Sequence, residues 1–149
     1  MGTGAGVAIY VATKVIAYVA VVYAGYRFLV PSVANPVWAS IAVGIGRFLM
    51  GIGFGLAIYA ASTTLFTSLS GFPLRSVITY LVVYVPTRWV EWSVIALIIT
   101  PSTHSWMGFL VGTGRADRSW RILGIVVSCA ADIPFMVSVG GIPVGRFFC

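Results

Sequence analysis

The chain has 149 residues, of which 60% are hydrophobic and only 8% are charged, and its formal net charge is +6. A soluble domain carries about a quarter charged residues, so this composition excludes a protein with a water-facing surface. The length leaves room for a single unit, residues 1–149, and the bases are scattered singly through apolar runs, which argues against a nucleic-acid partner. We expect an integral membrane protein in a lipid bilayer, most simply a cell (inner) membrane.

Four apolar runs are long enough to cross a bilayer, which takes about 20 residues as a helix. The runs cover residues 7–26, 37–60, 77–100 and 122–144, and the segments between them are rich in proline, glycine and serine. They are too long for barrel strands and lack the alternation of such strands. The predicted fold is an all-α membrane protein, a four-transmembrane-helix bundle. The second apolar run continues to Leu69, so this helix is expected to be long and tilted, or to end in an interfacial turn.

The first two predicted helices each carry one base within an apolar run. Lys14 is bracketed by Tyr10 and Tyr18 at four-residue steps, and Arg47 lies ten residues into the second run. Small residues let helices approach closely, and helical spacing places several on the face of Arg47. They are Gly44, Gly51 and Gly55.

The third predicted helix carries an arginine and a glutamate as its only charges. Arg88 and Glu91 are three residues apart and share one side with Tyr84 and Trp92. Pro86 removes one backbone hydrogen bond and predicts a kink in this helix.

The fourth predicted helix carries Asp132, followed by Pro134, which predicts a second kink. Asp132 shares a face with Gly124, Ser128, Met136 and Gly140. The third loop ahead of it contains WMGFL, expected to dip into the membrane interface, and GTGRADR, expected to be a solvated loop that touches anionic headgroups.

The bases of the loops predict the orientation of the chain. Loops one and three hold Arg27, Arg115, Arg118 and Arg121, and the opposite side holds Arg75 and Arg146. By the positive-inside rule, loops one and three are cytoplasmic and both termini are non-cytoplasmic.

The five charges within the predicted helices lie at similar depths. At about 1.5 Å per residue, Arg47, Glu91 and Asp132 lie about 15 Å from one membrane face. Lys14 and Arg88 lie about 18 Å from it. The hydrocarbon core is about 30 Å thick, so all five are expected near the midplane and must face inward.

Several pairings are possible within this set. Glu91 can neutralise Arg88 within one helix or Arg47 across helices, and Asp132 can pair with Lys14 or Arg88. Three bases against two acids leave one positive charge in excess. One interpretation is a network that only fixes packing. Another is a site for a small anion or anionic lipid, whose predicted residues are Lys14, Arg47, Arg88, Glu91, Asp132, Tyr10, Tyr84 and Trp92.

Catalytic chemistry finds little support in the sequence. His104 is the only histidine, and it lies in the third loop. Cys129 and Cys149 are far apart in the sequence, and both are interpreted as apolar thiols. These residues form no pattern for a metal or a haem, so no catalytic residue, metal or cofactor is predicted.

Two functions follow from the predicted bundle. The first is a carrier or channel that binds an anionic or amphiphilic solute at the midplane, with Glu91 or Asp132 available to couple protons. Four helices make a thin wall, so this function implies a homo-oligomer. The second is an accessory subunit of a larger membrane complex, whose buried charges pair with partner helices.

Overall fold

The structure is a computed structural model that describes residues 3–68, 80–100 and 105–139. These residues form helices and short connections, with no strand among them. The elements are α1 (Thr3–Leu29), α2 (Pro36–Ser68), the π-helical segment η1 (Tyr80–Tyr84), α4 (Val85–Ile99), α5 (Trp106–Val111), α6 (Arg115–Ala130) and α7 (Ile133–Val139).

Within this described part, four helical segments are long and apolar enough to cross a membrane. They are Gly6–Leu29, Pro36–Ile58, Leu81–Ile99 and Arg115–Val137. The prediction of an all-α protein with four helices long and apolar enough to cross a membrane is therefore confirmed for the described residues.

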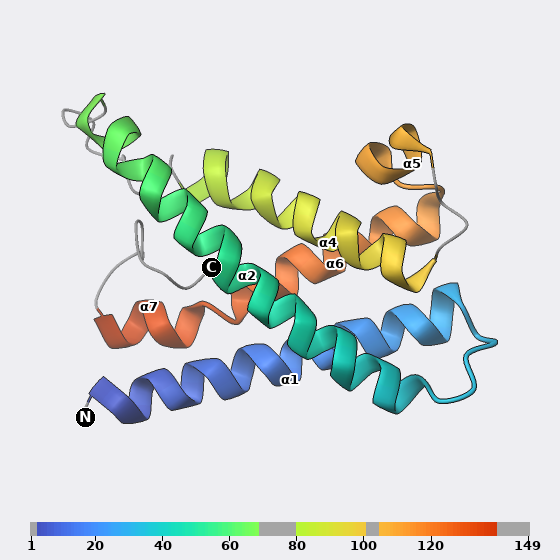
Figure 1. The fold of residues 1–149 in the computed structure, drawn as a ribbon. Coiled ribbons are helices and arrows are strands. Elements are labelled where there is room, and N and C mark those ends of the chain that lie inside the picture. Colours follow the sequence, from blue (N-terminus) through green and yellow to red (C-terminus); the bar gives the residue numbers. More distant parts are fainter. Residues whose placement is uncertain (1–2, 69–79, 101–104, 140–149) are drawn as a thin grey trace.

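Helix α1 is central to the arrangement. It contacts α2, α6 and α7, and α4 packs against both α2 and α6. In Figure 1, the start of α1 and the end of α7 lie at one end of the bundle, while the α1–α2 connection and α5 lie at the other. The four spans thus alternate in direction, as a chain that crosses a bilayer four times requires.

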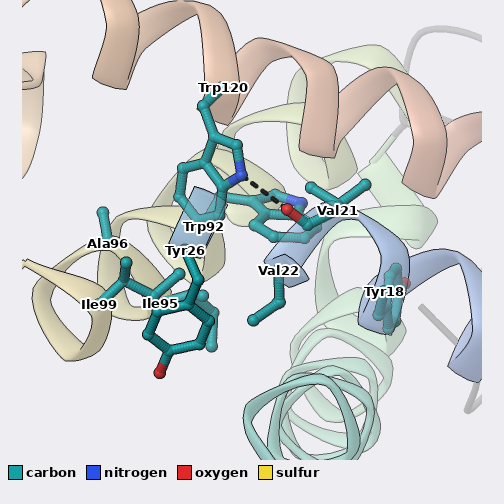
Figure 2. Close-up of a cluster of buried hydrophobic side chains, with 9 residues drawn as sticks. All are labelled: Tyr18, Val21, Val22, Tyr26, Trp92, Ile95, Ala96, Ile99 and Trp120. Carbon is teal, nitrogen blue, oxygen red and sulfur yellow. Dashed lines mark hydrogen bonds between the residues drawn. The ribbon is translucent and has the colours of Figure 1, made fainter. Parts of the chain in front are cut away.

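The apolar core is built around two tryptophans. The rings of Trp92 and Trp120 meet edge to face with centroids 5.3 Å apart. Each indole N–H has an acceptor: Trp92 donates to Ser128 Oγ at 3.1 Å, and Trp120 donates to the carbonyl of Val21 at 2.8 Å. Figure 2 shows the Trp120 bond and the aliphatic side chains that surround the two rings. Because both polar groups are satisfied, these large rings can be buried without a desolvation penalty.

Both prolines within the predicted third and fourth helices lie at the start of an α-helical segment. Pro86 falls in the first turn of α4, directly after the π-helical η1, and the Val83 carbonyl accepts the Thr87 hydroxyl at 2.7 Å. Pro134 falls in the first turn of α7, after the turn formed by Ala131 and Asp132. Pro134 costs no hydrogen bond at its position, since the first N–H groups of a helix have no partner within it, whereas Pro86 follows the π-helical turn η1 without a break. The kinks themselves stay a prediction.

The observed helix ends differ from the predicted ones. Helix α1 extends beyond residues 7–26 on both sides, and α2 continues to Ser68, in line with the long apolar run. The third span is described from residue 80, so the predicted start at 77 lies outside the described residues.

The largest difference concerns the fourth span. It begins at Arg115 rather than at residue 122, and a turn at Ala131 and Asp132 separates α6 from α7. The reason is Asp117 in the first turn of α6, whose Oδ2 accepts the Thr113 backbone N–H at 2.9 Å. This bond and the positive end of the helix dipole stabilise a helix start that hydropathy alone does not show.

The small-residue face of α2 is buried, as predicted from its spacing. Gly44, Arg47, Gly51 and Gly55 all lie in the interior. At Gly44 an added Cβ would lie 2.9 Å from the backbone N and Cα of Val19, so α1 and α2 are in backbone contact there. This close approach depends on glycine.

We predict that Gly44→Ala lowers the free energy of unfolding by about 1–3 kcal/mol, because the methyl group forces α1 and α2 apart. Gly46 is the matched control, since an added Cβ there meets nothing within 4 Å. Thermal unfolding in mild detergent measures both variants. Equal melting temperatures for Gly44→Ala and Gly46→Ala would contradict the predicted contact.

Candidate functional site

Five charged side chains are buried together between the spans. Lys14, Arg47, Arg88 and Glu91 are at most 1% exposed, and Asp132 is 3% exposed. They come from α1, α2, α4 and the turn between α6 and α7. The structure thus brings together the five charges that the sequence predicts near the midplane, and we call these five residues the interior charge cluster.

Asp132 is the acceptor for three side chains, two from α1 and one from α4. Its Oδ1 lies 2.9 Å from Lys14 Nζ and accepts the Tyr10 hydroxyl at 3.2 Å. Its Oδ2 forms an ion pair with the Arg88 guanidinium. One carboxylate therefore ties α1 and α4 to the turn that ends α6, and it faces two cations, so this part of the cluster carries a net positive charge.

Glu91 forms the second ion pair, with Arg47 of α2. The Arg47 guanidinium also lies over two rings, 4.8 Å from the centroid of Tyr18 and 5.3 Å from that of Trp92. Among the residues that the structure describes, Arg47 Nε and Nη1 have no acceptor, and Glu91 Oε1 has no donor. This pair is therefore neutral in charge but incomplete in its hydrogen bonds.

Of the pairings left open by the sequence, the structure forms Arg47 with Glu91, and both Lys14 and Arg88 with Asp132. Arg88 also donates to Cys129 Sγ at 2.7 Å. The interpretation of Cys129 as a purely apolar thiol is therefore wrong, because its sulfur accepts a bond from a buried cation. Cys149 lies outside the described residues.

The three predicted aromatic residues of the site are buried as well. Tyr10 contacts the cluster through Asp132, and its ring lies 4.8 Å from Lys14 Nζ. Trp92 supplies the ring beneath Arg47. Tyr84 is 3% exposed and lies one helical turn before Arg88. A role for these residues in binding stays a prediction.

A further buried ion pair, between Arg121 and Asp117, was not predicted from the sequence. Arg121 is 0% exposed, and its Nε and Nη2 each donate to a different oxygen of Asp117 at 2.9 Å. Its Nη1 donates to Ser93 Oγ at 2.7 Å and to the Phe109 carbonyl at 2.6 Å, and its Nη2 also donates to the Gly108 carbonyl at 3.1 Å. All five guanidinium donors are used, and they tie α4, α5 and α6 together.

The prediction that GTGRADR is a solvated loop is thus wrong in its second half. Arg115 to Arg118 form the first turn of α6, and Asp117 is buried. Gly112 keeps the connection tight with a φ of +85°, and an added Cβ there would lie 2.8 Å from Arg118 Cγ. The acid and base spacing of Asp117 and Arg121, one helical turn apart, is the signal that would have indicated this pair.

Arg121 is also wrongly counted as a loop base, because it is buried within α6. Arg27, Arg115 and Arg118 remain exposed at the end of the bundle that carries α5. Arg75, Arg146 and His104 lie outside the described residues. In the WMGFL segment, which forms most of α5, Trp106, Met107 and Leu110 are exposed, so its place in the interface stays a prediction.

Comparison of the chain with protein-family models, with curated proteins and with solved structures finds no match. The function must therefore be argued from the site itself. In the described part of the chain, no group of three or more histidine, cysteine, aspartate or glutamate residues is placed to hold a metal ion.

We predict that Arg121→Gln lowers the free energy of unfolding by about 3–5 kcal/mol, because it leaves Asp117 as a buried unpaired carboxylate. Arg118→Gln is the control, since Arg118 is an exposed base of the same helix and its loss should cost less than about 0.5 kcal/mol. Thermal unfolding in detergent compares the two. Similar stability of both variants would show that the Arg121 contacts are not structural.

We also predict that Glu91→Gln is destabilising by about 3–5 kcal/mol, because it leaves Arg47 as a buried cation without a counter-charge. The double variant Glu91→Gln with Arg47→Gln should recover more than half of this loss. A double variant no more stable than Glu91→Gln alone would refute the energetic coupling of the pair.

Proposed function

We propose that the chain is a small membrane carrier or channel whose interior charge cluster binds an anionic or amphiphilic solute. The observation that carries the proposal is the charge balance of the cluster. Three buried cations, Lys14, Arg47 and Arg88, lie with two buried carboxylates. The cost of a single charge at the bilayer centre is about 2.5–3.5 kcal/mol, so a positive excess favours the entry of an anion.

The open donors of Arg47 support the same proposal. A buried guanidinium normally uses most of its five donors, as Arg121 does, yet Arg47 has one acceptor among the described residues. In our proposal an anion is held by Arg47, Arg88 and Lys14. Glu91 and Asp132 act as counter-charges, and Tyr10, Tyr84 and Trp92 form the apolar wall.

Irregular backbone on both sides of the cluster would allow it to open. The π-helical η1 ends one turn before Arg88, and the α6–α7 turn contains Asp132 itself. π-helical turns are rare and occur frequently at functional sites. We propose that the third and fourth helices are kinked at Pro86 and Pro134, and that bending there changes access to the cluster.

The transport proposal includes a homo-oligomer and a fixed orientation. Only 22–44% of each span is buried inside the chain, so a pathway needs walls from another copy, most simply in a dimer. The exposed bases Arg27, Arg115 and Arg118 support a cytoplasmic position for loops one and three, with both termini non-cytoplasmic.

The low burial of the first two spans also favours the second function, an accessory subunit. These spans are 28% and 22% buried, which leaves a broad lateral surface for partner helices. Each charge of the cluster, however, has an ion-pair partner within this chain and is buried, so none of them is directed at that surface. We therefore place the carrier or channel first.

We predict that a bound anion stabilises the purified chain. With iodide, nitrate or laurate as probes, an anion at one hundred times its dissociation constant should add about 2.7 kcal/mol to the free energy of unfolding. Lys14→Met should keep the fold, because Arg88 and Asp132 remain as a neutral ion pair. The variant should no longer be stabilised by the anion. Thermal unfolding across an anion titration measures this, at constant ionic strength set with sodium gluconate.

Arg118→Gln is the matched control, because it removes one exposed positive charge and leaves the cluster unchanged. Stabilisation of equal size in the wild type and in Lys14→Met would contradict binding at the cluster. If none of the three anions stabilises the wild type and the chain purifies with foreign chains in fixed stoichiometry, the accessory-subunit function is favoured instead.

A further inference from the structure

The acidic residues of this chain are all buried, whereas several of its arginines are exposed. All three acids of the sequence, Glu91, Asp117 and Asp132, are buried, and each is ion-paired. The charged side chains exposed in the described residues are therefore all arginines: Arg27, Arg115 and Arg118. They lie at the end of the bundle where α1 stops and α6 starts, and no acid is exposed to oppose them.

An apolar groove of about 400 Å³ opens at this end, between α1 and α6. Its walls include Ala24 and Phe28 of α1 and Ala116, Ser119, Trp120 and Leu123 of α6. The groove runs between segments that belong to the membrane spans, so it faces the hydrocarbon region of the bilayer. It needs an apolar occupant.

Helical spacing places one base on each side of the groove. Arg27, in the last turn of α1, lies three residues after Ala24, and Arg115, the first residue of α6, lies four residues before Ser119. The spans end near these two residues, at Leu29 and Arg115, so their guanidinium groups can reach headgroup level. Asp117 does not neutralise these two bases, because both of its carboxylate oxygens accept hydrogen bonds from Arg121.

We infer that this groove binds an anionic phospholipid, with an acyl chain between α1 and α6 and the phosphate between Arg27 and Arg115. A free inorganic anion would leave the apolar walls without an occupant. A zwitterionic lipid brings a cationic group together with its phosphate, so only an anionic lipid offers the two guanidinium groups a net negative charge. Arginine suits phosphate because its planar donors can bind two oxygens at once. The site is separate from the interior charge cluster, so it stands whether or not the cluster binds a solute.

Native mass spectrometry of the full chain in detergent tests the inference, with phosphatidylglycerol and phosphatidylcholine of identical acyl chains as probes. The wild type should retain phosphatidylglycerol in preference to phosphatidylcholine. One base near the membrane surface contributes about a fivefold change in affinity for an anionic lipid, so Arg27→Gln and Arg115→Gln should each weaken retention about fivefold.

Two further variants separate the site from general charge attraction. Arg118 is equally basic and exposed, but its side chain packs near Gly112, so Arg118→Gln should retain phosphatidylglycerol like the wild type. Ala116→Phe fills the groove without changing charge and should reduce retention of phosphatidylglycerol while the melting temperature stays the same. Equal retention of both lipids, or equal losses in Arg27→Gln, Arg115→Gln and Arg118→Gln, would overturn the inference.

Discussion

The requirement that midspan charges find partners inside the chain determines how these four helices meet. A bilayer offers no water to solvate Lys14, Arg47 or Arg88, and an isolated charge there costs several kcal/mol. Two carboxylates form ion pairs with these three bases. Asp132 joins α1 and α4 to the α6–α7 turn, and Glu91 joins α4 to α2. Apolar contact alone distinguishes poorly between helix pairs in lipid, since lipid tails are as apolar as leucine. The ion pairs therefore select which helices of this chain meet.

Two buried arginines differ in how completely their hydrogen-bond donors are satisfied. Arg121 has a carboxylate of its own and an acceptor for each of its five donors, so nothing further is needed at that position. Arg47 has one carboxylate oxygen and two rings, with two nitrogens that have no acceptor among the described residues. Native interiors satisfy most buried polar groups, so an exception calls for an explanation such as a ligand or an ordered water. The contrast within one molecule makes the cluster, and not Arg121, the candidate site.

The sequence predicted the features that depend on composition and helical period. Run length predicted four spans, and depth along each helix predicted that the five interior charges would meet. It missed the start of α6, because a hydropathy reading treats the charged residues near Asp117 as a loop. Within α6, Asp117 and Arg121 lie on the buried face with Trp120, Gly124 and Ser128, whereas Arg115 and Arg118 are exposed. The sequence also could not predict which base pairs with which acid. That pairing depends on how far side chains reach from one helix to another, and not on residue spacing within a single helix.

The apolar groove and the interior charge cluster are joined by two indole rings in series. Trp120 lines the groove, its ring meets that of Trp92 with centroids 5.3 Å apart, and the Trp92 ring lies 5.3 Å from the Arg47 guanidinium. The rings have little freedom, because an added Cβ at Gly25 would lie 2.8 Å from the Trp120 indole and one at Gly124 would overlap the ring of Trp92. Both indole N–H groups are also bonded, one to α1 and the other within the pairing of α4 with α6. In the proposed carrier, a solute that enters from the basic end of the bundle therefore has to pass these two rings to reach Arg47.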